Sequence, residues 1–114
     1  MNKKSIVKEI KKIGSKIYEI SKTPDNKNER FDIMIKEKIF VCVDKIRCEL
    51  IIRNTKYFIS FRVYPFNCNI VSLSIDLMQD PIPSTQDKEM TLFEETLKIM
   101  NTVYNHIKKD NVQD

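Results

Sequence analysis

Aromatic and arginine side chains alternate with apolar ones in the segment "KYFISFRVYPF", residues 56–66. One set of alternate positions is apolar throughout, and the other set is Phe58, Ser60, Arg62 and Tyr64. Exposed aromatic rings on a sheet can stack on nucleic-acid bases while arginines hold phosphates. The same residue types are also enriched in protein–protein interfaces. The segment therefore predicts a binding surface rather than a reaction centre.

The preceding segment, residues 46–53, extends this surface by the same alternation. Together the two segments predict a candidate binding face made of Arg47, Ile51, Arg53, Phe58, Arg62 and Tyr64. Its apolar share is larger than a solvated sheet face needs, and patches of this kind commonly mark interfaces. Two alternatives remain open. Other parts of the chain cover the face, or a homodimer forms through this face or through the isoleucine-rich first helix.

Catalytic chemistry has little support in the sequence. The only histidine, His106, lies near the end of the predicted last helix, so any histidine-based acid–base pair must use it. Phosphate-cradling loops need several glycines, and the chain has one, Gly14. We therefore predict that the protein is not an enzyme and that it has no catalytic residues and no cofactor.

The three cysteines, Cys42, Cys48 and Cys68, each lie within or beside an apolar stretch. Zinc sites typically use paired spacing such as C-x-x-C, and the single histidine is distant in sequence. We therefore expect reduced cysteines that act as small core residues, and no metal site.

Charge is distributed unevenly along the chain, although the net charge is only +4. Residues 1–22 hold seven lysines and two glutamates, whereas residues 76–114 hold four lysines and eight acidic residues. The lysines predict a candidate basic helix face, made of Lys4, Lys8, Lys11 and Lys12. Such a face can attract phosphates, but the acidic C-terminal third argues against a dedicated nucleic-acid binder.

Hydrophobic periodicity predicts the elements that carry these residues. Isoleucines at steps of four and three predict a helix over residues 3–22, and a second such stripe predicts one over 88–109. Between them, a period of two predicts strands at 31–36, 39–43, 46–53, 56–64 and 69–78. Residues 31–43 could instead be partly helical, because Phe31, Ile35 and Ile39 also align on a helix.

These elements predict a two-layer α+β fold: an N-terminal helix, an antiparallel meander sheet of four to five strands, and a C-terminal helix. Both helices are expected on one face of the sheet, where they complete the core. A chain of 114 residues suits a single domain, residues 1–114.

The chain shows neither a signal-peptide pattern nor an apolar run long enough to span a bilayer, so we expect a cytoplasmic protein with no membrane partner. Abundant lysine, isoleucine and asparagine are typical of AT-rich genomes, including those of viruses and mobile elements. By elimination, we predict a small non-enzymatic protein-binding domain, such as an adaptor, inhibitor or accessory subunit. The alternative is a single-stranded nucleic-acid-binding protein that uses the sheet face and the lysine-rich helix.

Overall fold

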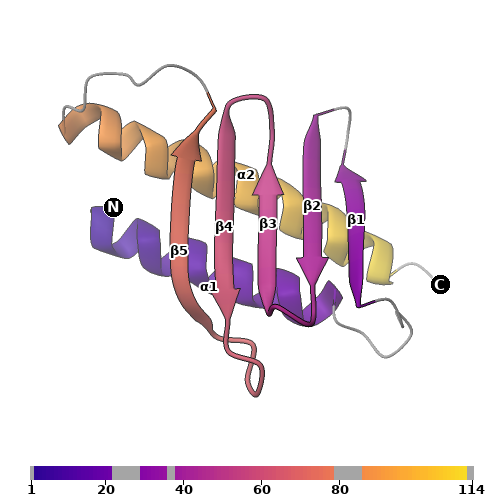
Figure 1. Ribbon diagram of the computed structural model, residues 1–114. Helices are drawn as coiled ribbons and strands as arrows, with labels where there is room; N and C mark the ends of the chain where they lie inside the picture. Colours follow the sequence, from indigo (N-terminus) through magenta and orange to yellow (C-terminus); the bar gives the residue numbers. More distant parts are fainter. Residues whose placement is uncertain (1, 22–28, 36–37, 79–85, 113–114) are drawn as a thin grey trace.

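The computed structural model describes residues 2–21, 29–35, 38–78 and 86–112. It is an α+β fold in which two helices enclose a run of five strands in the sequence (Figure 1). The bounds are α1 (Lys3–Ser21), β1 (Arg30–Ile35), β2 (Ile39–Asp44), β3 (Glu49–Arg53), β4 (Tyr57–Val63), β5 (Ile70–Leu77) and α2 (Gln86–Val112). The predicted fold class is thus confirmed.

The strands form one antiparallel sheet in the order β1-β2-β3-β4-β5 (Figure 1). Each strand pairs with the next one in the sequence, so the sheet is the predicted meander. β1 and β2 are paired along their whole length, from Arg30 opposite Asp44 to Ile35 opposite Ile39. The alternative of a partly helical segment at residues 31–43 is therefore wrong.

Side chains, rather than glycines, shape two of the turns. Asp44 Oδ1 accepts hydrogen bonds from the N–H groups two and three residues later, at 3.1 and 2.9 Å. Asn54 Oδ1 does the same between β3 and β4, at 2.9 and 2.7 Å. Such turns are a recurring use of Asp and Asn. The first of them, together with a φ of 55° at Cys48, delays the start of β3 to Glu49, three residues after the predicted start.

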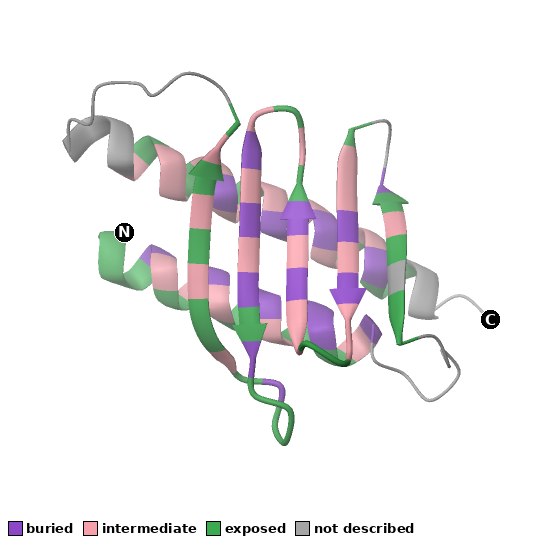
Figure 2. Cartoon of the chain, in the orientation of Figure 1, coloured by how far each residue is buried: buried purple, intermediate pink, exposed green. Residues whose placement is uncertain are grey.

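Both helices cover the same face of the sheet, as predicted (Figure 1). α1 packs against α2 and also contacts β4 and β5. Its buried stripe is the predicted one, and most of its isoleucines are almost fully excluded from solvent. Figure 2 shows the matching alternation of buried and less buried residues along β2, β3 and β4. The buried core consists of Ile6, Ile10, Ile13, Ile17, Tyr18, Ile35, Val41, Val43, Leu50, Ile52, Tyr57, Ile59, Phe61, Val63, Cys68, Met100, Val103 and Ile107.

Gly14, the only glycine, lies in the middle of α1 rather than in a turn. A Cβ atom at this position would lie 3.0 Å from Cε1 of Phe61 and 3.3 Å from two other atoms of the same ring. Carbon atoms pack best at about 3.5–4.0 Å. The missing side chain therefore allows α1 to approach β4 closely.

A β-bulge interrupts the pairing of β4 with β5. Arg62 is opposite Ser72 and Val63 is opposite Ile70, so Val71 is the extra residue. Ile70 consequently packs against the core, and Val71 is exposed. Strict alternation from Leu73 would bury Val71 and expose Ile70, because it does not allow for an inserted residue.

Two buried tyrosines connect the layers. The Tyr57 hydroxyl donates a hydrogen bond to the Glu95 carboxylate on α2, and Lys56 Nζ lies 3.4 Å from the same oxygen. On α1, burial raises the pKa of Tyr18 to about 12, with smaller contributions from the neighbouring thiols of Cys48 and Cys68.

Candidate binding face

The outer face of the sheet, opposite the helices, consists of three rows of side chains that cross all five strands. The register of the four strand pairs defines these rows. The aromatic row is Met34, Phe40, Arg53, Phe58 and Asp76. The middle row is Asp32, Cys42, Ile51, Ser60 and Ser74. The charged row is Arg30, Asp44, Glu49, Arg62 and Ser72. None of these fifteen described residues is buried, so the outer face is accessible over all three rows.

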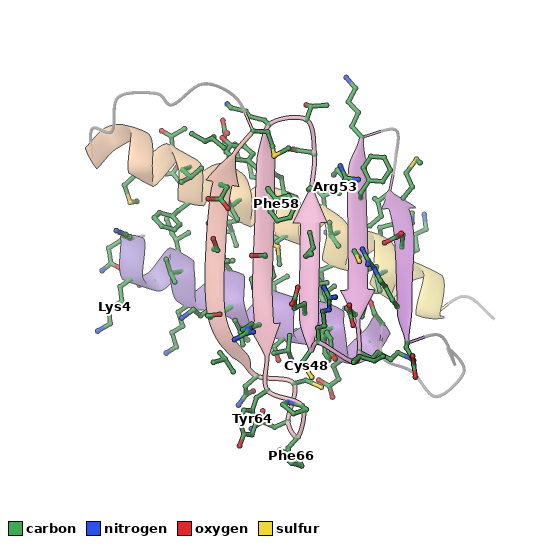
Figure 3. All side chains as sticks on the ribbon, in the orientation of Figure 1. Lys4, Cys48, Arg53, Phe58, Tyr64 and Phe66 are labelled. Carbon is green, nitrogen blue, oxygen red and sulfur yellow. The ribbon has the colours of Figure 1, made fainter. Side chains whose placement is uncertain are left out.

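The aromatic row joins an arginine to two phenyl rings on the adjacent strands. Arg53 on β3 is opposite Phe40 on β2 and opposite Phe58 on β4. The guanidinium carbon of Arg53 lies 4.7 Å from the centre of the Phe40 ring, which is within cation–π range. Figure 3 shows Arg53 and Phe58 side by side on the face turned away from the helices. At the end of the row, Met34 is 60% exposed.

A hollow of about 540 Å³ lies along the aromatic row, where it extends over β1, β2, β3 and β4. Phe40, Phe58 and Ile51 contribute apolar surface to it, and Arg30, Asp32 and Arg53 contribute charge. An apolar patch surrounded by polar groups has the anatomy of a protein interface.

The outer face is close to neutral. It carries three arginines and four carboxylates, which gives it a net charge of −1. In the charged row, Glu49 is opposite Arg62, and Asp44 is opposite Arg30. Opposite charges on neighbouring strands partly neutralise one another, so the face offers little net attraction to a polyanion.

Cys42 is the only thiol on the outer face, and its surroundings do not activate it. Burial raises the pKa of the Cys42 thiol, and a hydrogen bond with Asp32 raises it further, while Arg30 lowers it. The reactive form of cysteine is the thiolate. Cys42 is therefore a poor nucleophile at neutral pH. All three cysteines are free thiols, and Cys68 is buried while the other two are half-buried.

Four of the predicted face residues lie together on the outer face: Ile51, Arg53, Phe58 and Arg62. Arg47 does not belong there. It lies in the turn between β2 and β3, where its Nε is 4.0 Å from Asp44. Its predicted place on a strand was wrong because the turn at Asp44 interrupts an alternation that continues in the sequence.

Tyr64 also lies off the outer face. It follows the end of β4, and its ring centre is 5.7 Å from that of Phe66 (Figure 3). Phe66 is 87% exposed. Phe66 and, on the outer face itself, Met34 and Phe40 were not predicted from the sequence. Alternation within β1 and β2 was the signal that could have revealed the latter two residues.

The predicted basic helix face is exposed on the opposite side of the molecule. Lys4, Lys8 and Lys12 are exposed along one side of α1, and Lys16 continues their four-residue spacing. Lys11 is half-buried. Because α1 covers the inner face of the sheet, these lysines lie on the side of the molecule away from the outer face, and the two candidate surfaces do not adjoin (Figure 1).

No protein-family model, curated protein or solved structure matches the chain at a significant level. Within the described residues, no cluster of three or more His, Cys, Asp or Glu side chains could hold a metal ion. His106 is half-buried on α2. Over the described ranges, neither helix is long and apolar enough to cross a membrane.

Proposed function

We propose that the protein is a small non-enzymatic domain that binds another protein through the outer face of its sheet. The observation that carries this proposal is the aromatic row, in which Phe40, Arg53 and Phe58 meet on a face without buried residues. Aromatic and arginine side chains dominate the binding energy of many interfaces. The hollow beside the row offers a place for an apolar side chain of the partner.

The charge of the outer face supports a protein partner over a nucleic acid. Nucleic-acid binding relies on an excess of positive charge. The outer face has a net charge of −1, and the exposed lysines of α1 lie on the other side of the sheet. Free thiols throughout the described chain also suit an intracellular protein, where thiols stay reduced.

Self-association is a form of the same proposal. The isoleucine stripe of α1 lies in the core, so it is not available for a dimer of folded chains. A homodimer would therefore use the outer face, with Arg53 and Phe58 at its centre.

A second candidate function rests on the lysines of α1. Lys4, Lys8, Lys12 and Lys16 recur every four residues, which corresponds to a separation of about 6 Å along a helix. A row of positive charges of this kind could follow the backbone of a single-stranded nucleic acid.

The two functions can be separated with Phe58→Ser and a control that carries the same substitution elsewhere, Phe66→Ser. We expect a partner captured from the native host by the wild-type chain to be lost with Phe58→Ser and retained with Phe66→Ser. Light scattering on the purified chain tests the homodimer with the same two variants. The proposal is contradicted if Phe58→Ser and Phe66→Ser capture the partner equally and also show the same oligomeric state by light scattering.

Titration with labelled single-stranded RNA and DNA at low salt tests the second candidate. It predicts salt-dependent binding that the double substitution Lys8→Glu, Lys12→Glu weakens. If neither nucleic acid binds, the second candidate is excluded.

A further inference from the structure

The edge of the sheet formed by β5 is unpaired within the part of the chain that the structure describes. β5 ends the strand order, and among the described residues no strand pairs with its outer side. Met78 N–H donates to the Lys56 carbonyl at 2.8 Å, directed toward β4. Because these directions alternate along a strand, the N–H and C=O groups of Leu73, Ile75 and Leu77 point away from β4. They are positioned to bond with an added strand.

β5 also lacks the features that usually protect an edge strand. It has eight residues with one charged side chain, Asp76, and neither lysine nor proline. The opposite edge strand, β1, has six residues, and two of them are charged, Arg30 and Asp32. Short length, charge and proline commonly prevent edge strands from pairing with other chains. The two edges of the sheet are therefore not equivalent.

The helix layer continues beyond β5. Figure 1 shows the N-terminal parts of α1 and α2 projecting past this strand, on the side away from β4. Beneath the edge lies an apolar hollow of about 370 Å³. Its lining consists of Val7 and Lys11 from α1, Leu73 and Ile75 from β5, and Leu92 and Phe93 from α2. The helices thus provide an apolar surface for one more strand than the sheet contains.

The charge around this hollow is positive on the side of α1. Lys11 lines the hollow, and Lys3 Nζ lies 5.4 Å from the centre of the Phe93 ring. The N-terminus of α1 adds the positive end of its helix dipole, and its first turn contains no acidic residue. A strand placed here is favoured if its side chains near α1 are acidic.

We propose that the β5 edge and this hollow are a binding site for a sixth strand, supplied by an extended segment of another protein. The segment has apolar residues at alternate positions, which face the hollow, and acidic residues at its ends. Main-chain hydrogen bonds to β5 would supply affinity, and the hollow would supply specificity. This site is separate from the outer face and does not depend on the function proposed for it.

A second copy of the chain does not fit this site. Paired strands are about 4.8 Å apart. A helix with its side chains is about 10–12 Å across. If two β5 strands paired, the projecting helices of both copies would compete for the same space beneath the junction (Figure 1). A single extended segment brings no helices with it.

The proposal can be tested by NMR titration of the full chain with the probe peptide ETVTVTE, in which both valines and both glutamates lie on the face turned toward the hollow. The peptide ETTVVTE, which has the same composition without the alternation, is its control. We expect ETVTVTE to slow hydrogen exchange at the amides of Leu73, Ile75 and Leu77, and ETTVVTE to have no effect. Ile75→Pro should abolish binding, because it removes an N–H that faces the open edge and leaves the pairing with β4 intact.

Two further variants separate this site from its surroundings. Lys11→Gln should weaken binding of ETVTVTE about threefold at low salt, whereas Lys16→Gln, on the same helix, should not. Phe58→Ser, on the outer face, should bind the probe like the wild type. If Ile75→Pro does not fold, Val7→Asp tests the hollow in its place and should also abolish binding of the probe peptide.

Three results would overturn the proposal. The first is the absence of binding at millimolar peptide. The second is binding that persists in both Ile75→Pro and Val7→Asp. The third is a β5-dependent dimer of the chain alone, detected by light scattering and abolished by Ile75→Pro, which would assign the edge to a second copy.

Discussion

Gly14→Ala tests how closely α1 approaches the sheet. The new methyl carbon would lie 3.0 Å from Cε1 of Phe61, so the ring must move by roughly 0.5 Å to reach an ordinary contact. Phe61 is 1% exposed and lies between Leu50 and Leu73 on the neighbouring strands, which leaves it little room to move. Overpacking of this kind costs about 1–3 kcal/mol.

A gain in helix propensity opposes this cost. Alanine in a helix interior is favoured over glycine by about 1 kcal/mol. We therefore expect a net destabilisation of about 1 kcal/mol, which lowers Tm by about 4 °C for a chain of this size. Urea denaturation followed by circular dichroism measures the free energy of unfolding directly. Lys12→Ala, at an exposed site of the same helix, is the control and should change little.

A double-mutant cycle tests whether contact with Phe61 causes the loss of stability in Gly14→Ala. Phe61→Leu alone leaves space in the core, and Gly14→Ala should partly fill it. The double variant should therefore be more stable than the sum of the single effects by about 1 kcal/mol. A close contact between Gly14 and Phe61 is refuted if Gly14→Ala stabilises the protein by the full helix-propensity gain, or if the two substitutions are additive.

Three further predictions concern contacts that join the elements. Tyr57→Phe removes the hydrogen bond to the Glu95 carboxylate and should destabilise the protein by about 1–2 kcal/mol in urea denaturation; no loss would mean that water replaces the bond. Asn54→Ala removes the side-chain acceptor of the β3–β4 turn and should cost about 1 kcal/mol, whereas Asn54→Asp should retain most of the stability. Because the pKa of Tyr18 is about 12 in the folded state and near 10 in the unfolded chain, its contribution is complete below pH 10 and is lost as the pH rises toward 12. Stability measured from pH 9 to 12 should therefore fall more steeply for the wild type than for Tyr18→Phe, and parallel curves would contradict this assignment.

The period of the hydrophobic residues was sufficient to predict both helices and the strands β3, β4 and β5. It left the segment of β1 and β2 open, because Phe31, Ile35 and Ile39 also align on a helix. Periodicity reports which side chains share a face, and in this chain the core-facing set is strongly apolar. It does not report where a strand stops. Arg47 was placed on a strand because the alternation continues through the turn, and only the hydrogen bonds of Asp44 show that the chain reverses there.

The register of neighbouring strands and the position of the β-bulge could not be predicted from the sequence. Phe40 joins Arg53 through the register of β2 with β3, which depends on the length and shape of an intervening turn. The bulge beside Val63 reverses the orientations of Ile70 and Val71 without any change in composition.

The packing of α1 against α2 has a consequence for synthesis on the ribosome, because these helices come from opposite ends of the chain. Residues 22–85 separate them, so α1 is made several seconds before its partner at about 5–20 residues per second. During this interval the isoleucine stripe of α1 can meet only the emerging strands or other apolar surfaces in the cell. The lysines beside the stripe then act as charged flanking residues that oppose aggregation of the nascent chain.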